Sequence, residues 1–368
     1  MNFDFSDDQK LLQQTARDYL AEHSPLTVCR EILETDQPYA TDVWKGAAEM
    51  GWQGAVIPEE YGGAGFGHLE LAMIAEEVGR ALAPIPFSSS VYFATEALLR
   101  AGSDEQKKKY LPALASGDAI GTFALAEKVG HNDVENVAAK VSGGKLTGTK
   151  LPVCDGDVAS FAVAAAQGDD GLSLYLVDLD GEGVSRSPLG SFDPSRSMAQ
   201  IDFDGAAADL LGEAGQGGAL AEALLDRAAV LMAFEQLGAA DACFEATKDF
   251  TLGRYAFGRP VASFQAIKHR LADMWCELEM ARSNCYYGAW ALSNNEPELG
   301  VAACIARIQA SEALNQLSIE MVQMYGGVGF TWEYDCHLFY RRARLLAAAL
   351  GTPAAWKDRL VTRLGGDD

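Results

Sequence analysis

The sequence predicts an α+β protein in which a helical region, a strand region and a second helical region follow one another along the chain. Three observations lead to this prediction. Apolar residues recur at helical spacing up to about residue 115, and short strand-like runs occupy residues 116–215. Long helical patterns with few breakers fill residues 216–368. We therefore expect three domains, 1–115, 116–215 and 216–368, the last of them helical.

The first region begins with a helix-start signal. Ser6 precedes two aspartates, and Leu11, Leu12, Ala16 and Leu20 follow at helical spacing. The same pattern predicts helices over Thr41–Met50, Leu69–Leu82 and Asp104–Leu114. Between them, the Gly-rich stretch that starts at Pro58 predicts a loop.

The middle region consists of short runs rich in Val, Ala, Phe and Ile, separated by Gly and Asp pairs. This pattern predicts short antiparallel strands in a sandwich or barrel, over Ala119–Ala126, Val137–Val141, Val158–Ala166, Leu172–Asp178 and Gln200–Phe203. A Gly-rich connector, Gly212–Gly218, ends it. Three long amphipathic helices are expected next, over Leu220–Thr251, Phe264–Ser293 and Leu299–Met324.

Composition excludes several classes of function. The 368 residues carry a formal net charge of -23, which repels nucleic acid and anionic lipid, so we expect neither as a partner. The seven cysteines form no CxxC pair, and no metal is expected; reduced thiols are typical of a cytoplasmic protein. The first ten residues lack a basic start and an apolar run, so we expect no signal peptide.

Three ordered motifs resemble those of the acyl-CoA dehydrogenase family. Residues 58–81, PEEYGGAGFGHLELAMIAEEVGRA, are similar to its N-terminal signature. Residues 253–265 resemble its RxxFGxxixxxQ motif, and residues 323–330 its QxxGGxGF motif. The resemblance runs along nearly the whole chain and implies an FAD-dependent fold with the same order of helical, strand and helical domains, the last of them a four-helix bundle.

The resemblance also implies where FAD binds, at an interface between subunits. Arg254 can contact a diphosphate with two parallel hydrogen bonds. The resemblance implies that Phe257 and Gln265 bind FAD together with it. Glycines permit close approach of a ligand to the backbone, so the turn of a neighbouring subunit is expected to meet the same flavin. The residues of this turn are Gln323, Gly326 and Gly327. The site therefore needs at least a dimer.

Contacts to the flavin ring are expected from two segments of the strand region. Phe123, Leu125, Ala126 and Asn132 lie where the family has a TEPxAGSD-like loop, but Ala126 replaces the usual Thr. In the next segment Pro152 and Cys154 replace an aromatic residue and a Thr or Ser. Pro152 cannot donate a hydrogen bond and Cys154 donates weakly, so a flavin is held less firmly here or this face belongs to another subunit.

The family reaction removes the α-proton of an acyl-CoA thioester, which requires a base within about 3 Å of the α-carbon. The usual glutamate lies in a Tyr-Glu-Gly-Thr segment, and the matching residues here are Ala349, Leu350, Gly351 and Thr352. Leu350 thus replaces the base, while its backbone N–H remains a potential oxyanion donor. Ala349 replaces a large aromatic residue, which favours a bulky acyl group such as one with a ring.

A second base location known in the family corresponds to Ala228, which cannot accept a proton either. Glu235 lies on the same helix face about 10 Å further along, and is a weak substitute candidate. The remaining candidates, each more readily explained as a packed or surface residue, are Glu127, Glu333 and His337.

Three hypotheses remain open. In the favoured one, the chain is a subunit of a heteromeric acyl-CoA dehydrogenase of steroid side-chain or dicarboxylate breakdown, and a related subunit supplies the glutamate. In the second, it is a homomeric dehydrogenase with a non-standard base. In the third, it is a lyase or a thioester-binding protein of the same family. The resemblance implies an acyl-CoA substrate, a dimer or tetramer, and an electron-transfer flavoprotein as electron acceptor.

Overall fold

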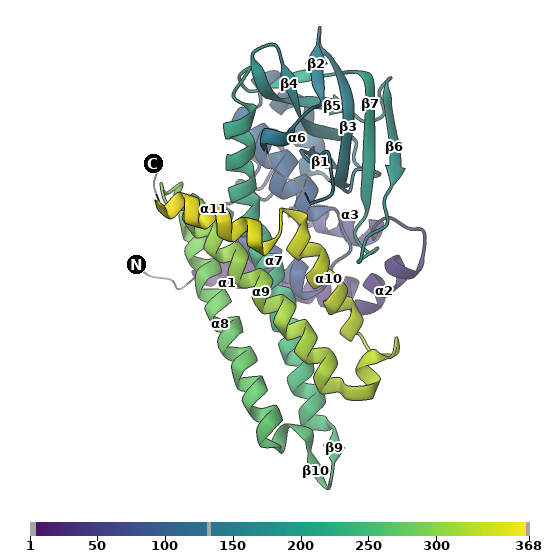
Figure 1. Cartoon of the computed structure of the whole chain (residues 1–368), viewed down its shortest axis with the longest axis vertical. Helices are drawn as coiled ribbons and strands as arrows, with labels where there is room; N and C mark the ends of the chain where they lie inside the picture. Colours follow the sequence, from purple (N-terminus) through teal and green to yellow (C-terminus); the bar gives the residue numbers. More distant parts are fainter. Residues whose placement is uncertain (1–4, 131–133, 366–368) are drawn as a thin grey trace. The chain divides into compact units, whose positions relative to one another are not determined.

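The structure is a computed structural model that describes residues 5–130 and 134–365. It divides into two compact units. The first comprises Met1–Glu31, His68–Ala83 and Ala229–Asp368, and the second comprises Ile32–Gly67 and Pro84–Ala228. The predicted order of helices, then strands, then helices is confirmed, and Figure 1 follows it from purple through teal to yellow.

The four helices predicted in the first third are observed as α1, α3, α4 and α6, whereas α2, η2 and α5 were not predicted. Ser6 caps α1 through a reciprocal pair of hydrogen bonds with Gln9, and Ser103 caps α6 in the same way. A π-helix, η2, precedes α5 and is fully buried. The bounds are α1 Asp7–His23, α2 Leu26–Glu34, α3 Thr41–Glu49, η1 Glu59–Tyr61, α4 His68–Arg80, η2 Ser88–Thr95, α5 Glu96–Ala101 and α6 Asp104–Ala115.

One eight-stranded sheet fills the second unit, in the order β6-β7-β3-β2-β4-β5-β8, with β1 also paired to β4. Most neighbours are antiparallel, as predicted, but β1 pairs with β4 in parallel, which corrects the expectation of a purely antiparallel domain. The bounds are β1 Gly121–Ala124, η3 Val134–Asn136, β2 Lys140–Ser142, β3 Lys145–Cys154, β4 Phe161–Gly168, β5 Gly171–Asp178, β6 Val184–Pro188, β7 Met198–Ala207 and β8 Asp209–Leu211.

Long helices build the first unit, and within it α9 packs against both α8 and α11 (Figure 1). Helix α4 meets α7 at two glycines: a Cβ on Gly79 would lie 1.8 Å from the Glu235 carbonyl oxygen, and one on Gly238 would lie 1.7 Å from that of Glu76. Only glycine allows backbones this close. The bounds are α7 Gly217–Gly253, β9 Tyr255–Ala256, β10 Arg259–Pro260, η4 Val261–Ser263, α8 Gln265–Asn294, α9 Leu299–Tyr325, η5 Gly326–Phe330, α10 Cys336–Ala349 and α11 Pro353–Gly365.

Candidate functional site

The predicted diphosphate-binding residues lie together at one end of the first unit. Arg254 directly follows α7, and its carbonyl oxygen accepts a hydrogen bond of 2.8 Å from the Val261 N–H, which closes the β9–β10 hairpin. Phe257 occupies the hairpin turn with a φ of 53° and is 96% exposed. Gln265 is the first residue of α8. Arg254 is exposed and has no acidic partner among the described residues, so its guanidinium is available to an anion.

The glycine turn lies near this hairpin in the same unit. Tyr325, the last residue of α9, stacks on Phe250 of α7 with a ring separation of 3.8 Å, and this stacking joins the ends of the two helices. Gly326 follows with a φ of 65°, which favours glycine, and both it and Gly327 are exposed. Gln323 is exposed one turn earlier. The turn therefore presents backbone to solvent, as the sequence predicts.

In the second unit the two predicted ring-contacting segments are adjacent. The Leu151 N–H donates to the Ala126 carbonyl oxygen at 2.9 Å, and the Thr122 hydroxyl donates to the Cys154 carbonyl oxygen at 2.6 Å. Phe123 stacks on Phe93 of the π-helix with centroids 5.1 Å apart. These contacts place Leu125 and Ala126 beside Pro152 and Cys154. Asn132 lies outside the described residues.

Lys150 and Glu127 form an ion pair that connects these two segments. The Lys150 Nζ donates to Glu127 Oε1 at 2.8 Å and to the Leu125 carbonyl oxygen at 3.0 Å. Burial lowers the pKa of Lys150 to about 8, although Glu127 opposes this shift. Glu127 also accepts hydrogen bonds from the backbone N–H groups of Ala138 and Ala139, both at 2.8 Å. Its carboxylate is therefore engaged in contacts that stabilise the fold, and it is poorly placed to abstract a proton.

Leu350 terminates α10 and carries no proton-accepting group. Its side chain is 8% exposed, and its carbonyl oxygen accepts a hydrogen bond of 2.9 Å from the indole of Trp356. The Leu350 backbone N–H is directed back to the Ala348 carbonyl oxygen. Thr352 caps the start of α11, since its hydroxyl accepts from the Ala355 N–H at 3.3 Å. The turn is thus fixed by its own backbone and by α11.

A buried arginine of α9 also stabilises the end of α10. Arg307 of α9 is 1% exposed and donates to the carbonyl oxygen of Leu346, near the end of α10. The guanidinium also donates to Gln236 Oε1 and, at 3.0 Å, to the Ser311 hydroxyl. Burial lowers the pKa of Arg307 to about 9, and the Glu235 carboxylate opposes that shift.

Glu235 itself is fully buried in the core of the first unit. Its charge stabilises the Arg307 guanidinium, so the structure gives this candidate base a packing role. A carboxylate with no exposed surface and a cationic neighbour is poorly placed to collect a substrate proton.

Ala228, the second base location, is fully buried on α7. The preceding residue, Arg227, forms a buried ion pair with Glu96 of α5 within the second unit. Burial lowers the pKa of Arg227 although Glu96 opposes the shift.

The segment after the glycine turn packs around Trp332. Arg30 stacks over the Trp332 ring at 4.6 Å and forms an ion pair of 2.6 Å with Asp335, while the His337 ring lies 6.1 Å from the same indole. Glu333 is exposed. His337 is therefore a packed residue.

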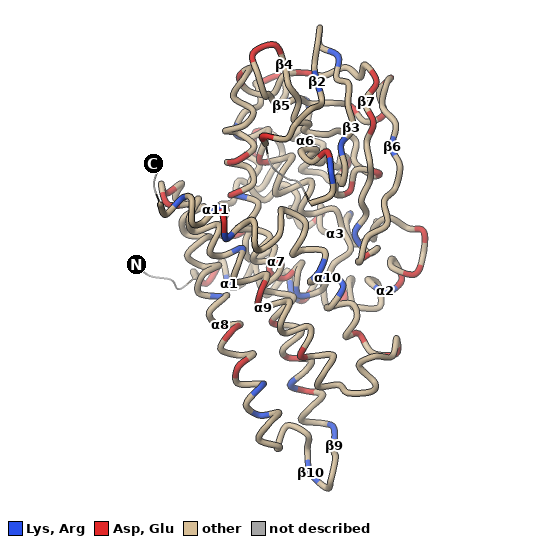
Figure 2. The backbone as a smooth tube through the Cα atoms, in the orientation of Figure 1, with Lys and Arg blue, Asp and Glu red and all other residues tan. Residues whose placement is uncertain are grey.

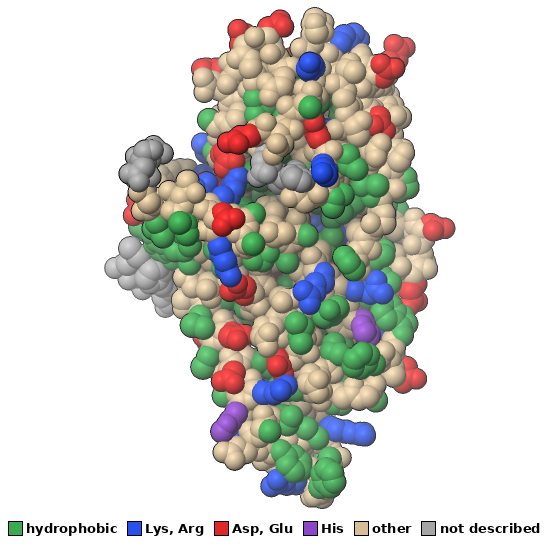
Figure 3. Space-filling model, in the orientation of Figure 1, with side chains coloured by type: hydrophobic (Ala, Val, Ile, Leu, Met, Phe, Trp, Pro, Cys, Tyr) green, Lys and Arg blue, Asp and Glu red, His purple; other side chains and the backbone are tan. Residues whose placement is uncertain are grey.

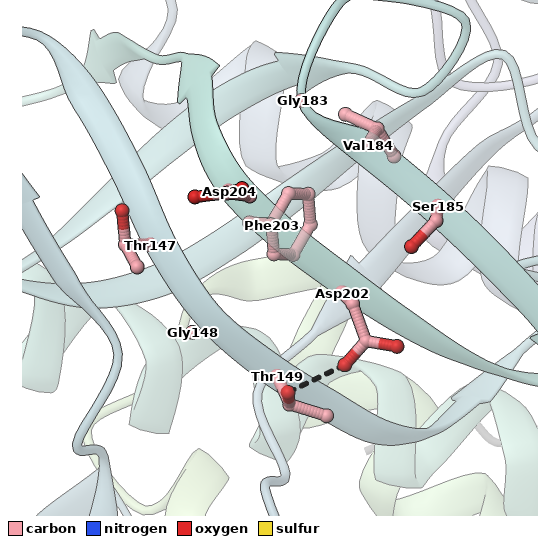
Figure 4. A pocket seen from close by; sticks show the side chains of 9 residues that line it. All are labelled: Thr147, Gly148, Thr149, Gly183, Val184, Ser185, Asp202, Phe203 and Asp204. Atoms are coloured by element: carbon pink, nitrogen blue, oxygen red, sulfur yellow. Dashed lines mark hydrogen bonds between the residues drawn. The ribbon is translucent and has the colours of Figure 1, made fainter.

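A hollow of about 470 Å³ opens on the face of the sheet formed by β3, β6 and β7 (Figure 4). Within it the Thr149 hydroxyl donates to Asp202 Oδ1 at 2.5 Å. It contains none of the predicted site residues. Among the described residues there is no group of three or more His, Cys, Asp or Glu side chains that could hold a metal ion, and all seven cysteines are free thiols. No helix of the described ranges has the length and apolarity to cross a bilayer.

Two residues that shape the site, Arg307 and Lys150, were not predicted from the sequence. A signal existed for both. Arg307 interrupts an otherwise apolar helix face in Leu299–Met324, and Lys150 lies on the same strand face as the buried Leu146. A cation on a buried face requires a partner, so its position in the apolar pattern could have marked each of these two residues as structurally important.

Comparisons with known proteins find two family models that match this chain. The model of the "Acyl-CoA dehydrogenase, N-terminal domain" matches residues 6–118, and that of the "Acyl-CoA dehydrogenase, C-terminal domain" matches residues 215–364. Acyl-CoA dehydrogenase IpdE2 of Mycobacterium tuberculosis is 31% identical over 359 residues, which are 97% of this chain and 98% of that protein.

Two solved structures of paired chains are similar over nearly their whole length. The ChsE4-ChsE5 complex of Mycobacterium tuberculosis contains a chain with a TM-score of 0.90 and 27% identity, and the match covers 100% of both chains. A variant of the Tcur3481-Tcur3483 steroid ACAD contains one with a TM-score of 0.89 and 28% identity, and the match covers 98% of both.

Proposed function

Because this chain belongs to the acyl-CoA dehydrogenase family of oxidoreductases, we propose that it is the subunit without the usual glutamate in a heteromeric, FAD-dependent acyl-CoA dehydrogenase. The observation that carries the proposal is the turn between α10 and α11, where Leu350 replaces the base. Ala228 leaves the second base location empty as well.

The proposed reaction is α,β-desaturation of an acyl-CoA thioester. The α-proton must pass to a base, and a correctly placed base accelerates such steps by about 10²–10⁴-fold. An aliphatic side chain cannot replace it. Glu235 and Glu127 are both engaged in cation contacts that stabilise the fold. A related subunit with a glutamate at the position of Leu350 would supply the base.

The residues present fit FAD, which when bound accepts the hydride from the substrate β-carbon. Arg254 is exposed without an acidic partner among the described residues, although the chain as a whole has a net charge of -23. An exposed cation beside an aromatic residue, Phe257, suits a diphosphate and its attached ring system. Gln265 and Gln323 offer amide donors, and Gly326 and Gly327 offer exposed backbone.

On the second unit, the contribution to flavin binding comes from the segments of Ala126 and Cys154. Since Pro152 has no N–H and Cys154 is a weak donor, these segments hold a flavin ring through backbone groups and packing. We infer that this chain alone binds FAD weakly. A second subunit contributes the opposite side of each interface site and so increases the affinity for FAD.

Two of the similar structures support a heteromer. The ChsE4-ChsE5 and Tcur3481-Tcur3483 structures each pair two differently named chains, and this chain is similar to a member of each over nearly its whole length. The small side chain of Ala349, where the family has a large aromatic residue, favours a bulky acyl group that contains a ring. We propose an electron-transfer flavoprotein as the electron acceptor and the cytoplasm as the location.

The test is a visible absorption spectrum of the chain purified alone and purified with a related subunit encoded beside it, followed by acyl-CoA titration. We expect a pale or colourless chain alone, and a yellow assembly that bleaches with substrate. A yellow chain that bleaches alone would support the homomeric alternative. Tight FAD without bleaching, together with release of a leaving group, would support the lyase alternative.

A further inference from the structure

A lysine with no exposed surface lies within the second unit, on β3. Lys150 is 0% exposed, whereas the lysine and arginine side chains visible in Figure 3 lie at the surface. Figure 2 shows the basic residues of β3, of which Lys150 is one. A buried ammonium group is costly, and a packed apolar side chain would stabilise a strand at least as well. Packing alone therefore does not account for a lysine at this position.

The polar contacts of Lys150 are made to one short segment that follows β1. Its Nζ donates at 3.0 Å to the Leu125 carbonyl oxygen and at 2.8 Å to Glu127 Oε1. The next residue of β3, Leu151, donates its N–H to the Ala126 carbonyl oxygen at 2.9 Å. Two consecutive residues of β3 thus hold three consecutive residues of the segment.

The same segment is fixed on both sides of these contacts. Before them, the Thr122 hydroxyl donates to the Cys154 carbonyl oxygen at 2.6 Å. After them, the Glu127 carboxylate accepts hydrogen bonds of 2.8 Å from the N–H groups of Ala138 and Ala139. A segment held at this many points has a defined backbone direction, so its remaining polar groups point to fixed places.

One polar group of the segment has no partner. The Ala126 N–H donates to no described residue, although Ala126 is only 5% exposed. The peptide bond is planar and trans, so this N–H points away from the Leu125 carbonyl oxygen, which Lys150 holds. Buried backbone N–H groups are nearly always hydrogen-bonded, so an acceptor on a bound molecule is expected here. The methyl side chain of Ala126 offers no donor, which leaves this role to the backbone.

We propose that Lys150 is a positioning residue for the flavin, because its hold on the Leu125 carbonyl oxygen directs the Ala126 N–H to an acceptor atom of the flavin ring. This donor compensates for the weak donors at Pro152 and Cys154. It is oriented before the ligand arrives, so binding requires no rearrangement of the segment. The inference rests on the function proposed above, in which FAD binds to these segments, and adds which backbone group contacts the ring and what orients it.

The test measures the affinity for FAD of the assembly formed by the full chain and its co-expressed related subunit, by flavin fluorescence after ultrafiltration. A hydrogen bond of ordinary strength corresponds to about tenfold in affinity, so Lys150→Met should bind FAD about tenfold more weakly. Lys150→Arg keeps a cationic donor and should lose less.

Arg186→Met is the matched control, and it should bind FAD as the wild type does. Like Lys150, Arg186 of β6 donates to backbone carbonyl oxygens and to a carboxylate within the second unit, but it contacts neither the segment of Ala126 nor that of Cys154. Its acceptors are Asp157, Ala159 and Asp180.

A second readout separates positioning from stability. Amide hydrogen exchange is followed in the peptide Phe123–Lys128 of each folded assembly, with and without FAD. We expect FAD to slow exchange in this peptide about tenfold in the wild type and in Arg186→Met, but not in Lys150→Met.

Wild-type affinity together with wild-type protection of this peptide in Lys150→Met would overturn the inference, yet leave the heteromeric function standing. Equal losses in Lys150→Met and Arg186→Met would also overturn it, since both would then reflect stability alone. The absence of FAD-dependent protection in the wild type, which needs no variant, would have the same consequence. Oxidation of an acyl-CoA by the chain alone would instead contradict the proposed function.

Discussion

At the scale of single residues, the account depends on which carboxylates can accept a proton. In the proposed function Leu350 and Ala228 stand at the two base positions of the family, and both side chains are buried and aliphatic. Glu235, the nearest substitute on the same helix face as Ala228, is fully buried and stabilises Arg307. On the proposed function, this chain therefore lacks one proton acceptor and keeps the residues suited to an anionic cofactor.

Glu235→Gln tests the structural role of that carboxylate. We expect the activity of the assembly to stay within about threefold of the wild type, because the side chain is enclosed in the core. The free energy of unfolding should fall by about 3–5 kcal/mol, because Arg307 loses its buried counter-charge. Steady-state kinetics and urea unfolding measure the two quantities. A loss of about 10²-fold or more in kcat would instead identify Glu235 as the base.

Lys150→Met should also destabilise the chain at pH 7.5, by about 3 kcal/mol, because it leaves Glu127 without its cation. The pH dependence has a defined sign. The folded pKa of Lys150 is about 8, below its unfolded value of 10.5, so the unfolded chain binds more protons between these values. The stability of the wild type should therefore rise by about 1–2 kcal/mol relative to Lys150→Met from pH 7.5 to 9.5. A fall over this range would contradict the assignment.

Arg254→Met tests the proposed diphosphate contact. Since a hydrogen bond to a charged group contributes about 1.5–3 kcal/mol, FAD should dissociate from the assembly roughly 10–100-fold more readily. Flavin fluorescence in the filtrate after ultrafiltration measures the loss. Arg270→Met, on an arginine of α8 that pairs with Glu320, is the matched control and should retain FAD.

At the scale of elements, α10 ends where Arg307 takes over the Leu346 carbonyl oxygen, which in a continuing helix would accept from the Leu350 N–H. This change of hydrogen-bond donor fixes the turn between α10 and α11, which faces the substrate in the proposed function. We expect Arg307→Met to raise hydrogen–deuterium exchange at Ala349–Gly351 by at least tenfold, and Arg307→Lys to raise it less because the charge remains. Equal exchange in all three proteins would contradict this role.

The strands also show where sequence reasoning succeeds and fails. Phe161–Gly168 and Gly171–Asp178 were predicted nearly in place, because their Val- and Ala-rich runs are buried on both faces. Lys145–Cys154 was not predicted as a strand, since its Gly148 and Pro152 suggest a break. In the sheet, shifts in register around Leu146 and Pro152 absorb these residues. Parallel pairing of β1 with β4 could not be predicted either, because no local pattern specifies which strand lies beside β1.

At the scale of the whole molecule, three spaced motifs were sufficient to predict the family and the exposed residues suited to FAD. The acidic surface between α8 and α9 was not predictable in this way. Most of the residues that line it are polar, and they come from two helices at positions more than twenty residues apart along the chain, so each polar residue appears in the sequence as an ordinary solvent-exposed position. Only the packing of α8 against α9 brings Asp273 and Glu277 near Glu312 and Glu320.

The most direct test of the central claim is made on the assembly with this chain unchanged. The partner's glutamate that corresponds to Leu350 is replaced by glutamine, and oxidation of a saturated acyl-CoA is followed in a single turnover. Because this chain contributes no proton acceptor, we predict that the rate falls by about 10²–10⁴-fold while FAD remains bound. Oxidation at the wild-type rate would contradict the account, since the base would then have to come from this chain.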